Sequence, residues 1–116
     1  MSDVAIAVQQ VVRTGLTASY TSGLTATTNT YQFVNDGYTL VHAKKSGAGD
    51  CTVTITTPGT VDGMAITDRT VTVVATTGDK FIGPFPPSVY NDANGKVSMV
   101  FSETTGLTVA VLRLKA

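Results

Sequence analysis

Apolar and polar residues alternate one by one along much of the chain after Tyr31. In Cys51–Thr57 the apolar residues Cys51, Val53 and Ile55 alternate with threonines. A period of two places the apolar residues on one face, which is typical of a strand half in the core and half in water. Similar short stretches predict further strands at residues 31–34, 38–43, 70–74, 80–83, 96–101 and 107–114.

Turn-forming residues separate the predicted strands. Asn35-Asp36-Gly37 predicts a tight turn, because Asn, Asp and Gly tolerate a positive φ. Residues 44–50 contain two glycines and predict a flexible hairpin connection between strands 38–43 and 51–57. Beyond residue 14 no stretch has the length and periodicity of an amphipathic helix.

The last predicted strand changes face along its length. Leu107, Val109 and Val111 share one face, whereas Leu112 and Leu114 fall on the other. Either a bulge near residues 110–112 or burial of both faces explains this switch.

The first 30 residues are less regular. Val4–Thr14 fits a strand or a short helix, and its valines favour an extended arm. Residues 15–30 are small, polar and rich in Gly, Ser and Thr, so they form either a loop or an arm that becomes ordered against a partner. We therefore divide the chain into an N-terminal arm, or first strand plus loop, at 1–30 and a β-sandwich domain at 31–116.

Composition supports an all-β fold. Threonine, which is β-branched and suits a pleated surface, occupies 21 of 116 positions. Together with turn signals about every 10–15 residues, this predicts about seven or eight short antiparallel strands. The expected fold is a single β-sandwich or jelly-roll-like domain preceded by the N-terminal arm.

The charge pattern limits the classes of partner that the chain is expected to bind. Eight basic and eight acidic residues give a net charge of zero, and no basic run is longer than Lys44-Lys45. We therefore expect no binding to nucleic acid and no membrane contact. Met1-Ser2-Asp3 does not begin a secretory leader, so we expect synthesis in a cytoplasm and no secretion by that route. Weak self-repulsion suits association with other copies or with a large partner.

Catalytic patterns are not evident, and we expect a protein that is not an enzyme. His42 is the only histidine and Cys51 the only cysteine, and alternation predicts a packed or interface His42 and a buried Cys51. The aspartates fall mostly in turns, where their side chains hydrogen-bond the local backbone. We expect neither a metal nor another cofactor.

Two stretches are candidates for an interface. Residues 81–90 combine aromatic, aliphatic and proline residues without charge, which fits either the core or a contact surface. The arm is the second stretch. The candidate interface residues are Val12, Arg13, Leu16, Tyr20, Phe81, Ile82, Phe85, Pro86 and Tyr90.

An ordered set of short motifs spans about residues 11–114. It consists of Val12-Arg13-Thr14-Gly15-Leu16-Thr17, Asn35-Asp36-Gly37, Val53-Thr54-Ile55, Thr60-Val61-Asp62-Gly63, Asp68-Arg69-Thr70-Val71-Thr72-Val73, Phe81-Ile82-Gly83-Pro84-Phe85 and Tyr90-Asn91-Asp92. This set resembles small head proteins of tailed bacteriophages, the capsid decoration or cement proteins.

The resemblance implies a virion protein on the capsid exterior that binds the major capsid protein and reinforces the assembled shell. Such proteins are often β-sandwiches or β-tulip-like folds and often homotrimers, although other homo-oligomers occur. The resemblance carries no catalytic or binding signature to particular residues.

Two other functions remain open. One is a carbohydrate- or receptor-binding module of a virion fibre, although the chain has no Trp and its tyrosines are dispersed at positions 20, 31, 38 and 90. The other is a structural component of the neck or tail.

Overall fold

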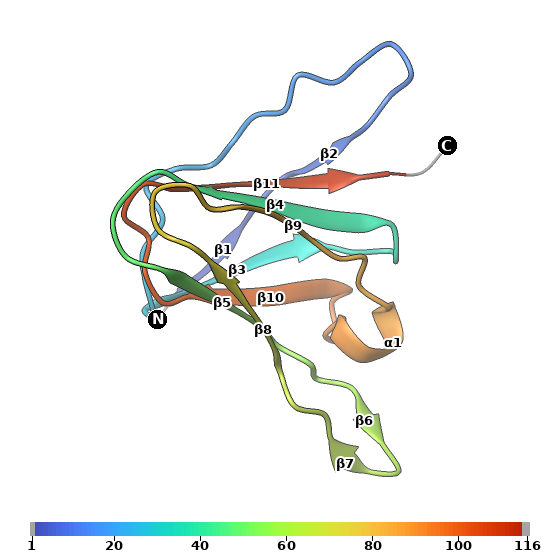
Figure 1. The fold of residues 1–116 in the computed structure, drawn as a ribbon. Coiled ribbons are helices and arrows are strands. Elements are labelled where there is room, and N and C mark those ends of the chain that lie inside the picture. Colours follow the sequence, from blue (N-terminus) through green and yellow to red (C-terminus); the bar gives the residue numbers. More distant parts are fainter. Residues whose placement is uncertain (1, 115–116) are drawn as a thin grey trace.

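Two β-sheets pack face to face in the computed structural model of the chain, which describes residues 2–114 (Figure 1). Sheet A contains, in spatial order, β1 (Ser2–Ala5), β3 (Asn29–Val34), β10 (Lys96–Phe101), β5 (Cys51–Ile55) and β8 (Arg69–Val73). Sheet B contains β2 (Val8–Gln10), β11 (Leu107–Arg113), β4 (Thr39–Lys45) and β9 (Asp79–Ile82). The all-β prediction is confirmed.

The core lies between the sheets, where the alternating apolar residues meet. Cys51, Val53 and Ile55 of β5 are fully buried, as alternation predicts. Two aromatic contacts reinforce this layer, between Tyr31 and Phe101 and between Phe33 and Phe85, with ring centroids 5.4 Å and 5.7 Å apart. The buried free thiol of Cys51 packs as a small apolar side chain.

The strands do not pair as the sequence suggests. We expected a hairpin between the strands now seen as β4 and β5, but they belong to different sheets, and residues 46–50 cross from one sheet to the other. The sandwich strands pair with one another antiparallel, as predicted. The two strands of the arm pair in parallel, β1 with β3 and β2 with β11. Alternation identifies the inward face of a strand, but it contains no information on the neighbour.

Strand β11 has no bulge. Its residues pair in unbroken register with β4 from Leu107 opposite Lys45 to Arg113 opposite Thr39. Both faces are covered instead, because Val109 and Val111 point into the core while Ala110, on the outer face, is only 1% exposed. Coverage of the outer face therefore accounts for Ala110 and in part for the half-buried Leu112, whereas Leu114 lies beyond the strand and is exposed.

Three short elements were not predicted from the sequence. The hairpin of β6 (Thr60–Val61) and β7 (Met64–Ala65) extends away from the sandwich (Figure 1). The third is α1 (Pro87–Tyr90), which follows the proline-rich segment. With four residues, it is the only helix of residues 2–114, and no helix there is long enough to span a membrane.

Residues 2–10 are built into both sheets. β1 forms one edge of sheet A and β2 one edge of sheet B, and the chain crosses between the sheets at residues 6–7. Ile6 at this crossing and Leu24 in the following loop both belong to the core cluster. The N-terminal arm therefore contributes directly to packing within its own chain.

We expect Ile6→Ala to destabilise the protein by about 2–4 kcal/mol, because the change removes a core side chain and leaves a cavity. The matched control is Val12→Ala, which we expect to change stability by less than about 0.5 kcal/mol. Ile6 is 7% exposed and Val12 is 46% exposed. Chemical unfolding of both variants measures the difference, and equal effects would contradict the assignment of the arm to the core.

Candidate functional site

Several chain segments meet where β11 ends. Arg113, its last residue, pairs with Gln10 of β2 on one side and with Thr39 of β4 on the other. The turn between β3 and β4 lies at the same end, since Asp36 hydrogen-bonds the Arg113 side chain. We call this part of the molecule the Arg113 end.

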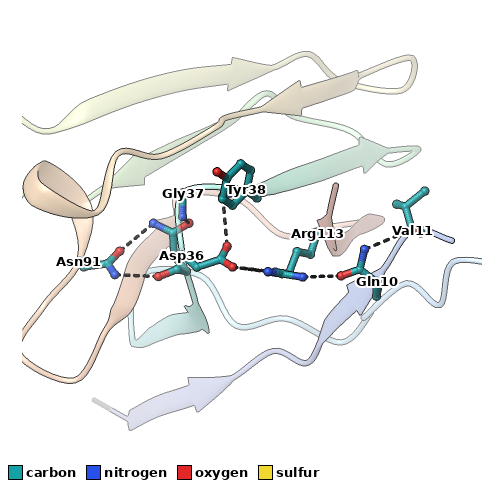
Figure 2. A network of polar contacts seen from close by, with 8 residues as sticks. Gln10, Val11, Asp36, Gly37, Tyr38, Asn91 and Arg113 are labelled. Atoms are coloured by element: carbon teal, nitrogen blue, oxygen red, sulfur yellow. Dashed lines mark hydrogen bonds and ion pairs between the residues drawn. The ribbon is translucent and has the colours of Figure 1, made fainter. Parts of the chain in front are cut away.

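The Arg113 side chain joins the arm to the turn. Its Nε and Nη2 donate to Oδ2 of Asp36 at 2.8 Å and 2.5 Å, and its Nη1 donates to Oε1 of Gln10 at 2.7 Å (Figure 2). Charge-assisted bonds of a planar guanidinium fix direction as well as distance. The start of the arm loop is thereby held at a defined position beside the turn.

Two asparagines hold the turn to the segment around α1. The amide of buried Asn35 donates to Phe85 O at 2.8 Å and to Asn91 Oδ1 at 2.7 Å, and Asn91 Nδ2 donates to Asn35 O at 2.8 Å. Gly37 in this turn has a φ of 94°, a conformation that favours glycine. The turn and α1 therefore form one rigid corner of the Arg113 end (Figure 2).

The arm loop folds back from the Arg113 end along sheet B. Val12 begins a turn that Gly15 closes by donating its N–H to Val12 O at 3.0 Å. The Gln9 side chain then bonds the Ser19 backbone through both its amide nitrogen and its oxygen, at 2.7 Å and 2.8 Å. Thr21 finally forms a two-bond bridge with Val109 of β11. The loop is thus fixed at several points along its length.

Large apolar side chains are exposed around the Arg113 end. One of them is the last residue of β3, and the others lie just after β2, just before β4 or just after β11. Because these strand termini meet, the side chains lie at one end of the molecule. These residues are Val12, Leu16, Val34, Tyr38 and Leu114. We call them the apolar rim.

A pocket of about 250 Å³ opens beside this rim. Its wall combines two valines with the polar groups of the Arg113 network. The lining residues are Val8, Gln10, Val34, Asp36, Thr39 and Arg113. The buried hydroxyl of Thr39 has no hydrogen-bond partner within residues 2–114. The pocket is large enough for one side chain of a partner.

A second cluster lies on the outer face of sheet B, centred on His42. The Phe81 ring stacks on His42 with centroids 4.0 Å apart and planes 8° apart, and Tyr20 meets the imidazole edge-on at 5.5 Å. Tyr20 Oη lies 2.7 Å from Nδ1, and the Asp79 carboxylate bonds Nε2. His42 is therefore only 8% exposed although it points out of the sandwich.

The donors and acceptors of this cluster match one another. An ionised Asp79 only accepts, so His42 Nε2–H donates to it; in a neutral imidazole, Nδ1 then accepts from the Tyr20 hydroxyl. The imidazole thus holds two aromatic rings in fixed positions. Cys51 belongs to the core side of sheet A, so the structure does not bring Cys51 and His42 together.

The predicted interface residues divide into two groups. Val12, Arg13, Leu16, Tyr20, Phe81 and Pro86 are exposed. Ile82 and Phe85 are buried in the core, which is one of the two roles that the sequence left open for residues 81–90. Alternation along β9 turns Ile82 inward opposite the outward Phe81, and Phe85 packs on Phe33. Tyr90 is half-buried and packs against the core.

Sequence reasoning did not identify the rest of the Arg113 end. Val34, Tyr38 and Leu114 lie at strand termini far apart in the chain, and Arg113 is 77 residues from Asp36. The only local signal was the Asn35-Asp36-Gly37 turn.

Comparisons of the chain with protein-family models, curated proteins and solved structures found no match. Within residues 2–114, no group of three or more His, Cys, Asp and Glu side chains is arranged to hold a metal ion.

The hydrogen bond from Arg113 lowers the pKa of Asp36 below its ordinary value of 3.8. A carboxyl with a lowered folded-state pKa stabilises the fold fully above its unfolded-state pKa, and this contribution disappears as the pH falls through the folded-state pKa. A bond from Thr105 likewise lowers the pKa of Glu103. Acidification therefore removes the stability that the Asp36 and Glu103 carboxylates contribute to the fold.

We expect Asp36→Asn to reduce the loss of thermal stability when the pH falls from about 5 to about 2, because the variant has no carboxyl to protonate there. Thermal unfolding across this range measures the slope, and the matched variant Glu103→Gln isolates the second carboxyl. An unchanged slope in Asp36→Asn would show that the bond to Arg113 does not contribute to acid sensitivity.

Proposed function

We propose that this chain is a structural virion protein that binds the outside of an assembled phage capsid and stabilises it. The proposed partner is the major capsid protein. The rigid apolar rim at the Arg113 end carries the proposal. Figure 1 shows the loop after β2 extending away from sheet B at this end, where a partner surface can reach it.

Rigidity makes the rim suitable for binding. An interface loses affinity when its loops must be ordered, and here hydrogen bonds already hold the two ends of the loop and the turn. Anchors of a contact surface are commonly apolar or aromatic side chains surrounded by polar groups. Val12 and Leu16 fit the first class, and the neighbouring Arg13 fits the second.

Repetition of the binding site strengthens modest contacts. A shell presents many equivalent positions, and a symmetric oligomer bound to several of them gains affinity through effective concentration. We therefore propose a homotrimer, or another closed homo-oligomer, as the binding form. Strands β8 and β9 end their sheets and offer edges that a second copy can cover.

We also propose that the fold is related to the jelly roll. From β3 to β5 and from β8 to β11, each successive strand belongs to the opposite sheet. Connections that cross repeatedly between two antiparallel sheets are typical of Greek-key and jelly-roll folds.

Co-sedimentation with assembled capsids of the phage or prophage that encodes the chain tests the proposed function. We expect the wild-type protein to sediment with capsids, and the double variant Val12→Ser, Leu16→Ser to lose at least about tenfold in affinity. Both side chains are exposed, so the double variant should fold normally.

Met64→Ser is the matched control, since Met64 is also exposed but lies on the β6–β7 hairpin. We expect this variant to bind capsids as the wild type does. A folded wild-type protein that does not sediment with capsids would refute the proposal, and equal weakening by both variants would refute the assignment to the rim.

Sedimentation equilibrium tests the proposed oligomer directly. We expect a single species with the mass of a trimer or another closed oligomer of the 12.0 kDa chain. A monomer at all accessible concentrations would contradict self-association before binding.

A further inference from the structure

The pocket of about 250 Å³ at the Arg113 end lies where the interior of the sandwich reaches the surface. Gln10 of β2, Arg113 of β11 and Thr39 of β4 lie side by side in register and line it. Thr39 points toward the opposite sheet, because Val41, two residues further along β4, is fully buried in the core. The pocket therefore opens between the two sheets.

The lining residues differ in depth. Thr39 is 1% exposed and forms the floor, and the half-buried Val8 forms part of the wall. Val34, at the end of β3 in the opposite sheet, is 61% exposed and lies at the mouth. The bonded side chains of Arg113 and Asp36 also lie at the mouth, since both reach solvent. From mouth to floor, the pocket presents an ion pair, then apolar walls and last a hydroxyl.

The hydroxyl at the floor is unpaired. Among the side chains of residues 2–114, the Thr39 hydroxyl is the only buried polar group without a hydrogen bond. Burying a hydroxyl without a partner costs free energy, and native structures pair the large majority of such groups. A ligand that brings a hydrogen-bonding group to the floor supplies the missing bond. The unpaired hydroxyl therefore indicates the chemistry of the group that the pocket receives.

The volume of the pocket suits one aromatic ring. An apolar cavity of roughly 150 Å³ holds a benzene molecule. The pocket has about 250 Å³ and is open on one side, which leaves room for a substituent on the ring. Val8 and Val34 offer apolar contact to such a ring.

Other kinds of side chain match the pocket less well. A purely apolar side chain leaves the Thr39 hydroxyl unpaired. An amide group has two donors and two acceptor lone pairs, more than a single hydroxyl can satisfy. A charged side chain loses water on entry and finds the charges of Arg113 and Asp36 already bonded to each other. A phenol has one apolar ring and one hydroxyl, which can donate to Thr39 or accept from it.

We infer that this pocket receives the side chain of a tyrosine from the partner that covers the Arg113 end. The phenol ring packs against Val8 and Val34, and its hydroxyl bonds Oγ1 of Thr39. The inference rests on the proposed function, since the major capsid protein supplies this tyrosine. Aromatic anchors in pockets commonly contribute a large part of the affinity of an interface, so the pocket gives the apolar rim a specific centre.

Titration of the isolated chain with p-cresol, which is the tyrosine side chain as a free molecule, tests the pocket without capsids. Toluene, which has the same ring and methyl group but no hydroxyl, is the matched probe. We expect p-cresol to shift the ¹⁵N–¹H NMR signals of residues 8–10, 34–39 and 111–113 with a Kd of about 1 mM. The ratio of the affinities for p-cresol and toluene reports the contribution of the hydroxyl.

Thr39→Val tests the bond at the floor. Valine has nearly the shape of threonine, and removal of an unpaired buried hydroxyl should not destabilise the fold. We expect the affinity for p-cresol, relative to that for toluene, to fall by about threefold to tenfold. Thr72→Val makes the same change on the outer face of sheet A and should leave the ratio as in the wild type.

Competition in the co-sedimentation assay tests the source of the ring. p-Cresol at roughly 10 mM, about ten times its expected Kd, should weaken capsid binding of the wild type by about tenfold. The same concentration should weaken capsid binding of Thr39→Val by less, because this variant binds p-cresol less tightly.

Three outcomes would overturn the inference. They are no p-cresol shifts around the pocket, an affinity ratio in Thr39→Val equal to that of the wild type, or capsid binding that p-cresol does not weaken. If capsids bind but p-cresol neither binds nor competes, the inference fails and the proposed function remains. If the wild type does not sediment with capsids, the proposed function fails, and the capsid protein as the source of the tyrosine fails with it, even where p-cresol binds.

Discussion

The backbone of β11 needs hydrogen-bond partners on both edges, and this constraint organises the rest of the structure. On one edge β4 satisfies it over seven consecutive residue pairs. On the other edge the N-terminal arm satisfies it twice, first through β2 in parallel and then through Thr21. An unpaired edge is a place where other chains add strands, so covering it also protects the protein from aggregation. The path of the arm follows from this requirement.

The same strand also positions side chains at both of its ends. Its last residue, Arg113, fixes the arm and the β3–β4 turn at the apolar rim. Thr108, near its first residue, begins a row of paired residues that continues through Lys44 to Asp79. Because Arg113 and Thr108 belong to one strand, the distance between them is set by the strand and does not depend on flexible loops.

Alternation predicted much of the fold because a strand with one buried face must repeat every two residues. It identified the buried residues of β5, such as Val53 and Ile55. It could distinguish only the residues that face the core from those that face solvent. It could not reveal that β4 and β5 belong to different sheets, since pairing depends on contacts between distant segments. The same limit applies to the candidate site. Tyr20 and His42 are 22 residues apart, and no local pattern connects them.

The outer faces of the two sheets differ in the side chains that they present. On sheet A, threonines pair across β5 and β8, Thr52 with Thr72 and Thr54 with Thr70. Such pairs suit a pleated surface in water. On sheet B the equivalent face has Phe81 and Tyr20 around His42 and is crossed by the arm. The aromatic cluster therefore makes the outer face of sheet B partly apolar, whereas the threonines keep the outer face of sheet A polar.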